Sequence, residues 1–259
     1  MARIHLFEFG DQNWVPKFLR DYATDFLEFG ANQFNIYRPV FDIFERGVKK
    51  SSVPKIIDMG AGGGGGWPKI IPQLREQGLS FKVRLTDFNP NLGAFKKMQS
   101  RFPDTIEFEE KPVDAQNVPS HLPGFRTMFL SFHHMKKHQA KRILQNAVDS
   151  GEPIGIFELQ DRSVMSLFFM FIMAPINAIL TAPFIKPFKL GRVFFTFIIP
   201  LLPLMIWFDG VVSNLRTYHE SELKALVSGL DNSDGYQWEI DRRKNGPGFV
   251  LYLFGYKKD

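Results

Sequence analysis

A glycine-rich turn that follows a short apolar run is the feature that most constrains the fold of this chain. The run within residues 55–67 ends at Asp58, and six glycines follow before a segment that opens at Pro68. Proline is tolerated in the first turn of a helix, where its missing N–H would be unpaired anyway. Glycine permits positive φ and a close approach of a ligand to the backbone, and a helix N-terminus attracts anionic groups. The pattern predicts a strand, a turn and a helix that form a nucleotide-binding corner.

Composition limits the partners and the chemistry. The 259 residues carry a formal net charge of +5, and the basic residues are scattered rather than gathered in a tail. This distribution argues against nucleic acid as a partner and fits an anionic membrane surface better. The chain contains no cysteine, which excludes disulfides and thiol catalysis and favours a reducing compartment. The first nine residues lack the long apolar core of a signal peptide, so we expect none.

Residues 1–50 carry many aromatic side chains among charged ones. Apolar residues recur at helical spacing over 16–29, and a second helix is expected over 31–48. We predict that residues 1–50 form a helical lid in which Trp14 and Tyr22 line a substrate pocket. The alternative is that these helices pack on a sheet and their aromatic residues belong to the core.

The rest of the chain predicts alternating strands and helices. Strands are expected at 55–58, 81–88, 105–113, 127–132 and 153–159, and helices at 68–77, 91–101 and 136–150. Two further strand-like runs, 236–243 and 249–256, are joined by the turn residues 244–248, which indicates an antiparallel hairpin. We therefore predict an α/β fold with a seven-stranded, mostly parallel Rossmann-like sheet, helices on both faces, an antiparallel C-terminal hairpin and an apolar helical insertion.

The glycines alone fit two nucleotide-binding motifs. Gly60-x-Gly62-x-Gly64 suits a methyltransferase, whereas Gly60-x-Gly62-x-x-Gly65 suits a dinucleotide fingerprint equally well. Acids at the ends of successive strands decide between the two: Asp58, then Asp87, then Asp114 next to Ala115. With the terminal hairpin, this order resembles the class I S-adenosylmethionine-dependent methyltransferases. The resemblance covers about 50–160 and 209–259, and we assign residues 51–163 and 209–259 to the methyltransferase core.

The resemblance implies S-adenosylmethionine as the cofactor. An acid after the second strand would accept hydrogen bonds from the ribose hydroxyls, and the acid after the third would meet the adenine amine. The implied cofactor-binding residues are Asp58, Gly60, Ala61, Gly62, Gly64, Asp87, Phe88, Asp114, Ala115 and Ser131. For each of the three acids, a local role in a turn or as a helix cap is the alternative.

Two adjacent histidines follow the fourth predicted strand. Residues 131–135, Ser-Phe-His-His-Met, resemble the fourth motif of many small-molecule methyltransferases. We predict that His133 or His134 is the catalytic base or orients the acceptor, since a base is needed when the acceptor is protonated. The alternative is that both only hydrogen-bond locally. A metal site with His138 lacks suitable carboxylate or cysteine spacing, so no metal ion is expected.

Residues 164–208 form an insertion that a plain soluble methyltransferase would not need. The runs 164–180 and 193–208 contain no charged residue, are interrupted by proline and are shorter than the ~20 residues of a membrane-spanning helix. The connector carries Lys186, Lys189 and Arg192, which disfavours crossing to the far side. We predict a membrane-associating hairpin with its basic residues at anionic headgroups. A buried layer, an oligomer interface and a two-pass anchor are the alternatives.

These features predict a methyltransferase that acts on a lipophilic small molecule or lipid at the cytoplasmic face of a membrane, as a peripheral or monotopic protein. Residues 209–218 return the chain to the sheet, and we predict that Arg216 and Tyr218 bind the acceptor together with Trp14 and Tyr22. For any single residue of 209–218, a salt bridge or a helix cap is the alternative. A homo-oligomer is also compatible with the apolar insertion. The alternative function is a non-catalytic cofactor-binding or assembly protein that uses the insertion as a docking surface.

Overall fold

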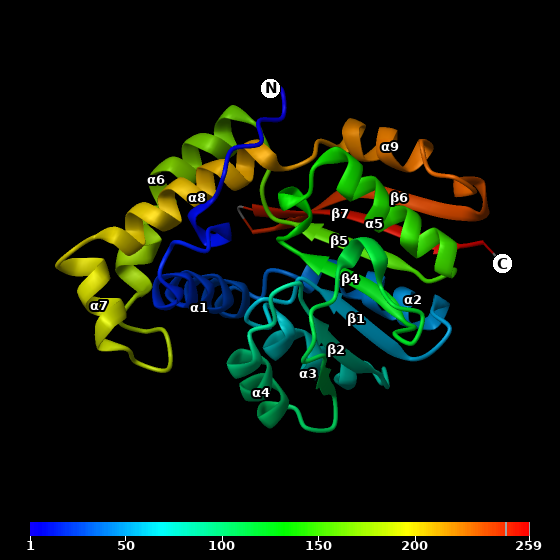
Figure 1. Cartoon of the computed structure of the whole chain (residues 1–259), viewed down its shortest axis with the longest axis horizontal. Helices are drawn as coiled ribbons and strands as arrows, with labels where there is room; N and C mark the ends of the chain where they lie inside the picture. The colour runs from blue at the N-terminus through cyan, green and yellow to red at the C-terminus, as the bar shows by residue number, and fades with distance from the viewer. Residues whose placement is uncertain (247, 259) are drawn as a thin grey trace. The chain divides into compact units, whose positions relative to one another are not determined.

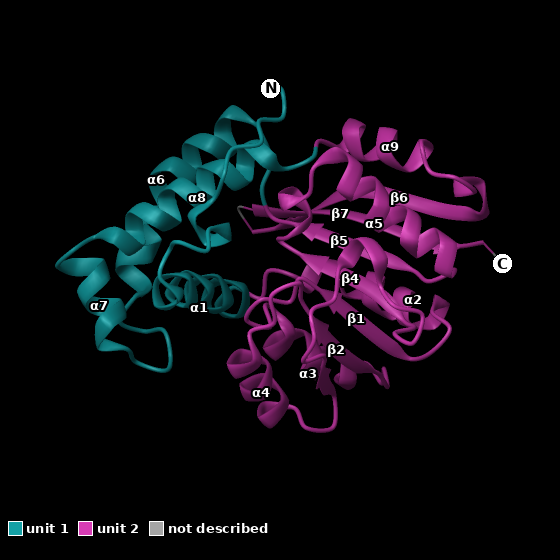
Figure 2. Cartoon of the chain, in the orientation of Figure 1, with its two compact units in different colours: residues 1–34, 160–218 teal, residues 35–159, 219–259 magenta. Residues whose placement is uncertain are grey.

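The computed structural model describes residues 1–246 and 248–258 and divides the chain into two compact units. One unit comprises Met1–Phe34 and Gln160–Tyr218, and the other Asn35–Leu159 and His219–Asp259 (Figure 2). We call them the helical unit and the sheet unit. This division differs from the predicted one, since residues 35–50 group with the sheet and residues 1–34 group with the insertion. Pro247, part of the predicted hairpin turn, lies outside the described residues.

The sheet unit is built on a mixed sheet of the predicted type (Figure 1). Within the described residues its seven strands are β1 (Lys55–Met59), β2 (Lys82–Thr86), β3 (Ile106–Phe108), β4 (Phe125–Phe129), β5 (Ile154–Glu158), β6 (Tyr236–Asn245) and β7 (Gly248–Lys257). Their order is β3-β2-β1-β4-β5-β7-β6. The first five run parallel, and β7 pairs antiparallel with both β5 and β6. The order reverses between β1 and β4, where ligands bind in doubly wound sheets.

Helices cover both faces of this sheet. The helices of the sheet unit are α2 (Phe41–Lys50), α3 (Trp67–Glu76), α4 (Leu92–Arg101), α5 (Lys137–Ser150) and α9 (Glu220–Ser228). The strands β1, β2 and β3 follow one another toward one edge of the sheet, whereas β4 and β5 follow one another toward the opposite edge. Because crossovers between parallel strands are right-handed, α3 and α4 lie on one face of the sheet and α5 lies on the other. Contacts between α2 and α3 and between α5 and α9 extend the two layers.

Aromatic residues fill the layer between α2 and the sheet. The Phe44 ring stacks on Phe157 and Phe129, with centroids 5.0 Å and 5.9 Å away. A methyl group added at Gly47 would lie 2.5 Å from the Phe125 ring, so only glycine lets α2 approach this closely. Phe41 and Phe44 of α2 therefore belong to the core of the sheet unit.

Several element boundaries differ from the predictions. The first helix, α1, runs over Lys17–Gln33, and the predicted helix over 31–48 is replaced by a turn and the shorter α2. The predicted third strand, 105–113, is reduced to the three residues of β3. The second apolar run of the insertion is divided into α7 (Leu190–Phe197) and α8 (Leu201–Arg216). Proline at residues 200 and 203 explains this division, since it removes backbone donors at the start of α8.

The helical unit packs through a narrow seam of small and aliphatic residues. Helix α6 (Val164–Thr181) contacts α8, and its buried residues Ala174 and Ala178 cluster with Leu202 and Ile206. Most other apolar side chains of α6 are exposed or half-buried. Within the described residues, α6 alone is long and apolar enough to cross a membrane, and the α7–α8 pair, bent by 76°, would count as a second span if it acts as one. The predicted alternative of a buried helical layer does not fit this exposure.

Candidate cofactor and acceptor site

The glycine turn between β1 and α3 leaves backbone surface open. Gly60, Gly62, Gly64 and Gly65 all have positive φ, which accounts for glycine at these positions. Among the described atoms, none lies within 4 Å of a methyl group added at Gly62. At Gly62 the turn therefore presents its backbone without an overlying side chain, and a ligand can approach it closely there.

Asp87 joins the end of β2 to this turn. Its Oδ2 accepts a hydrogen bond of 2.9 Å from the Gly62 N–H, and its Oδ1 accepts one of 2.8 Å from the Asn89 N–H. A carboxylate has about four acceptor positions, so both oxygens retain capacity for ligand hydroxyls. Phe88 follows with 63 % of its surface exposed, an uncommon state for phenylalanine. The predicted pair of acid and aromatic ring is thus displayed beside the glycine turn.

Asp58 faces the protein interior instead. The side chain is 2 % exposed, and its oxygens accept hydrogen bonds from Trp67 Nε1 at 2.7 Å and Thr127 Oγ1 at 3.3 Å. Burial raises the pKa of Asp58 to about 7, against the opposing effect of these hydrogen bonds. The sequence placed Asp58 among the cofactor-binding residues. The structure gives it a supporting position, in which it fixes the first residue of α3 to β1 and β4.

Replacing Asp58 with asparagine should change how stability depends on pH. Because the folded pKa of about 7 exceeds the reference value of 3.8, the folded state keeps a proton that the unfolded state loses between these values. The contribution of Asp58 to the free energy of unfolding should therefore be highest below about pH 4 and fall as the pH rises to about 7. The introduced amide does not titrate, so the variant should gain about 2 to 4 kcal/mol relative to wild type between pH 4 and pH 8. Urea unfolding at both pH values measures this, and parallel pH dependence of the two proteins would contradict it.

Asp114 lies in the long connection after β3. Its Oδ1 accepts a 2.9 Å hydrogen bond from the Gln116 N–H and caps a short 3-10 helix, Ala115–Asn117. The preceding residue, Val113, donates its N–H to the carbonyl oxygen of Asp87 at 2.9 Å. Asp114 therefore has the local capping role that was the alternative to cofactor binding in the sequence analysis. The backbone bond nevertheless brings the Asp114–Ala115 pair to the end of β2, as the predicted order of acids requires.

The segment after β4 turns through strained backbone. Leu130 has φ of +48°, a region that bulky residues rarely adopt, and Ser131 follows it. A methyl group added at Gly60 would lie 3.3 Å from Ser131 Oγ, so this hydroxyl adjoins the glycine turn. Among the described atoms, Ser131 Oγ is a buried side-chain oxygen with no hydrogen-bond partner. A buried hydroxyl of this kind is well suited to a polar ligand group.

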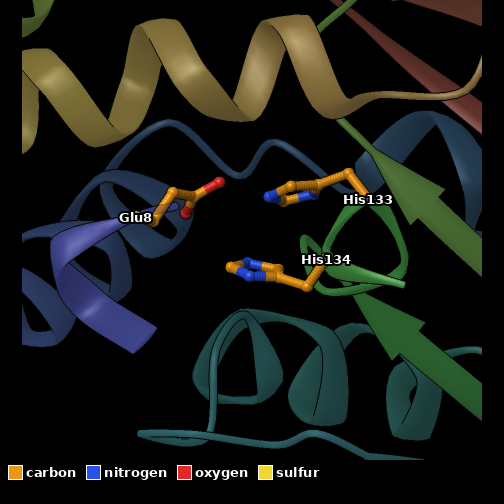
Figure 3. Close-up of side chains that lie close together, drawn as sticks. All are labelled: Glu8, His133 and His134. Carbon is orange, nitrogen blue, oxygen red and sulfur yellow. The ribbon is translucent and has the colours of Figure 1, made fainter. Parts of the chain in front are cut away.

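His133 is held by the end of the neighbouring strand. Glu158, the last residue of β5, accepts the His133 backbone N–H on Oε1 at 3.0 Å and contacts His133 Nδ1 through Oε2 at 2.9 Å. Both side chains are buried. An ionised Glu158 fixes the proton of a neutral His133 on Nδ1, which leaves Nε2 with the lone pair. The His134 ring lies 4.3 Å from that of His133, centroid to centroid (Figure 3).

Tyr37 is a buried polar residue of this region that sequence reasoning missed. Its ring packs edge-on against Phe129, and a methyl group at Gly66 would lie 2.6 Å from its Cδ2. Burial raises the pKa of Tyr37 well above its usual value, and the nearby Glu158 and Asp58 raise it further. The phenol therefore stays protonated. One tyrosine in an aromatic-rich stretch gives no sequence signal for this position.

The four predicted acceptor-binding residues all belong to the helical unit. Arg216 is buried and pairs with Glu8 at 3.0 Å and Asp11 at 2.9 Å, so it anchors the N-terminal segment. The guanidinium of Arg3 lies 4.0 Å from the ring centre of Tyr218. The remaining two residues of the prediction differ in exposure, with Tyr22 half-buried and Trp14 exposed. Contacts with residues of the N-terminal segment, inside the helical unit, therefore explain the positions of Arg216 and Tyr218.

No protein-family model matches the chain, and a comparison with curated proteins gave no match. Similar solved structures include human N-acetylserotonin methyltransferase in complex with SAM, with 14% identity over 93% of this chain and a TM-score of 0.53. A SAM-dependent methyltransferase from Aquifex aeolicus has 14% identity over 90% of this chain and 97% of its own, with a TM-score of 0.51. The pyocyanin biosynthetic protein PhzM has 13% identity over 84% of this chain and a TM-score of 0.50.

The chain spans 56% of the length of the human enzyme and 54% of that of PhzM. The strand order, the antiparallel last strand and the glycine turn at the reversal point agree with these similarities. The chain therefore has the fold of the class I, Rossmann-like S-adenosylmethionine-dependent methyltransferases.

Proposed function

We propose that this protein binds S-adenosylmethionine and transfers its methyl group to an acceptor. The observation that carries the proposal is the contact between Asp87 and Gly62, which joins an acid at the end of β2 to an open glycine turn. In this assignment Asp87 accepts the ribose hydroxyls, the exposed face of Phe88 covers the adenine ring, and Asp114 with Ala115 meets its amine. Ser131 and the backbone of Gly60, Ala61, Gly62 and Gly64 contact the rest of the cofactor.

The cofactor supplies a methyl group on a sulfonium, which is a good leaving group for in-line displacement. The protein has to orient the acceptor and remove a proton from it where one is present. The contact of His133 with Glu158 supports His133 as the base, because a lone pair on Nε2 accepts a proton while the nearby carboxylate stabilises the resulting cation. His134 would orient the acceptor through its neighbouring ring.

A lipophilic acceptor at a membrane surface is the second part of the proposal. Its support is the exposed apolar surface of α6, α7 and the first turn of α8, which greatly exceeds the scattered apolar residues of ordinary protein surfaces. Helices of this composition lie in or on bilayers. We place the protein at the cytoplasmic face as a peripheral or monotopic protein, so that the acceptor would reach the site from the lipid.

Two measurements test the proposal. Calorimetric titration with S-adenosylhomocysteine should show saturable binding to the purified protein, and absence of binding would refute the cofactor assignment. Incubation with labelled S-adenosylmethionine and a membrane lipid extract should place label in the organic phase. The protein could also bind S-adenosylhomocysteine and yet transfer no label to either the lipid or the aqueous fraction of the extract. That result would favour the alternative of a non-catalytic cofactor-binding or assembly protein.

A further inference from the structure

The loop between α6 and α7 exposes large apolar side chains. Phe184 is 69 % exposed, Leu190 is 77 % exposed, and Phe188 between them is exposed as well. We call residues 182–190 the tip. Exposed phenylalanine in a loop is costly in water, whereas it is favourable in the interfacial and hydrocarbon regions of a bilayer.

Arg192 pairs with three backbone carbonyl groups of the tip from inside the helical unit. Its side chain is 0 % exposed. The guanidinium donates to the carbonyl oxygens of Ala182 at 3.3 Å and Pro187 at 2.9 Å, and also to that of Ile185. A loop that stays in water needs no such arrangement, because water hydrates its carbonyls. A loop that enters hydrocarbon does need it, since water is absent there and an unpaired polar group is strongly unfavourable.

The charges of the tip are also compensated internally. Asp25 on α1 accepts a hydrogen bond from Arg192 at 2.9 Å and another from Lys189 at 2.7 Å. Of the three basic residues in 164–208, Lys186 is the one with an exposed side chain. A lysine can extend its ammonium group to the headgroups while its stem lies in an apolar layer. The predicted contact of Arg192 with headgroups is therefore wrong, because Arg192 is enclosed by protein.

We propose that the tip inserts into the acyl-chain region of a bilayer, with Arg192 as the internal cap that makes its backbone compatible with lipid. This inference rests on the membrane-surface part of the proposed function and specifies which residues enter. Lipid is favoured over a protein partner because protein interfaces offer polar groups at their rim. The exposed side chains of the tip are mainly apolar, and three of its carbonyl groups are already paired with Arg192.

The absence of cysteine allows a direct test by single-site labelling. The variants Phe184→Cys and Phe188→Cys would carry the environment-sensitive fluorophore NBD, with Lys224→Cys, exposed on α9, as the control. With vesicles of phosphatidylcholine and phosphatidylglycerol, both tip labels should shift to the blue and the control label should not. Lipids with a nitroxide deep in the acyl chain should quench the tip labels more than lipids with a nitroxide at the headgroup.

The outcomes separate this inference from the rest of the proposal. If vesicles recruit the protein but the tip labels remain aqueous, the inference fails and membrane association stands. If vesicles recruit no protein, the inference and the membrane surface both fail, while titration with S-adenosylhomocysteine still decides the cofactor. A blue shift without vesicles that grows with protein concentration would mean that a second copy covers the tip, which also overturns the inference.

A charge variant tests the role of the internal cap. Asp25→Asn leaves Arg192 and Lys189 without their carboxylate, so vesicle affinity should fall at least about tenfold because an uncompensated charge opposes insertion. Asp21→Asn is the matched control, since Asp21 lies on the same helix and pairs with the exposed Lys17. Equal vesicle affinity of the two folded variants would contradict the cap. If Asp25→Asn does not fold, the labelling experiment decides alone.

Discussion

Replacement of Asp87 by Ala should reduce the affinity for S-adenosylhomocysteine at least about hundredfold. Hydrogen bonds to a charged group contribute about 1.5–3 kcal/mol each, and Asp87 is expected to accept two from the ribose. The variant also loses the bond to the Gly62 N–H, so the glycine turn is less well fixed before binding. Calorimetric titration measures the change in dissociation constant.

Two controls make the Asp87 result specific. Asp87→Asn keeps one acceptor oxygen and should bind with intermediate affinity. Asp104→Ala removes an exposed acid of the same unit, outside the glycine turn, and should bind as the wild type does. Wild-type affinity in Asp87→Ala would exclude the ribose assignment, whereas equal losses in Asp87→Ala and Asp104→Ala would point to a general charge effect.

The sequence predicted the parts of the site that depend on local pattern. Strand, glycine turn and helix follow one another along the chain, so the corner around Gly60 and Gly62 could be derived from residue types alone. The position of Asp87 followed in the same way, because the ends of successive parallel strands lie at the same edge of a sheet. Apolar runs and turn residues similarly predicted the five strands and the terminal hairpin along the chain.

Residues whose role depends on a distant partner could not be predicted. Asp58 and Asp87 both end strands, yet Asp58 is enclosed by Trp67 and Thr127, the latter from β4. In the sequence, Arg192 is a basic residue of an apolar hairpin and is expected at its surface. In the structure it is buried and pairs with Asp25, which is far away in the sequence. A charged residue is expected at the surface unless a partner is known, and that partner becomes visible only in the tertiary structure.

One boundary failed because the strand signal is shorter than the predicted run. Within 105–113, Ile106 and Phe108 alternate with glutamate, whereas residues 110–112 are Glu, Lys and Pro. Strand β3 lies at the edge of the sheet and pairs with β2 over three residues. After β3 the chain leaves the sheet, and the bond from Val113 to Asp87 directs it to the site. The segment between β3 and Asp114 therefore serves to position this acid rather than to extend the strand.

Replacement of His133 by Ala should lower kcat about 10²- to 10⁴-fold, with S-adenosylhomocysteine affinity little changed, because general-base catalysis contributes that much. His134→Ala is the matched control, since it removes the neighbouring ring but leaves the contact of His133 with Glu158. A larger loss in His134→Ala than in His133→Ala would reassign the base.

Glu158→Gln should reproduce much of the loss seen in the His133 variant. If the NH₂ of the introduced amide faces His133, Nδ1 of the imidazole accepts a hydrogen bond from it. The imidazole proton then lies on Nε2, which no longer has the lone pair that a base needs. Glu158→Asp keeps the carboxylate and should therefore have a higher kcat than Glu158→Gln. If Glu158 acted through packing alone, Glu158→Gln would be the milder variant, because glutamine has the size of glutamate and aspartate is shorter. If both His133→Ala and Glu158→Gln retain wild-type kcat over the whole pH range, the acceptor carries no proton to remove. Its nucleophile would then be an atom that is already unprotonated, and the buried pair would serve to hold the segment after β4 in place.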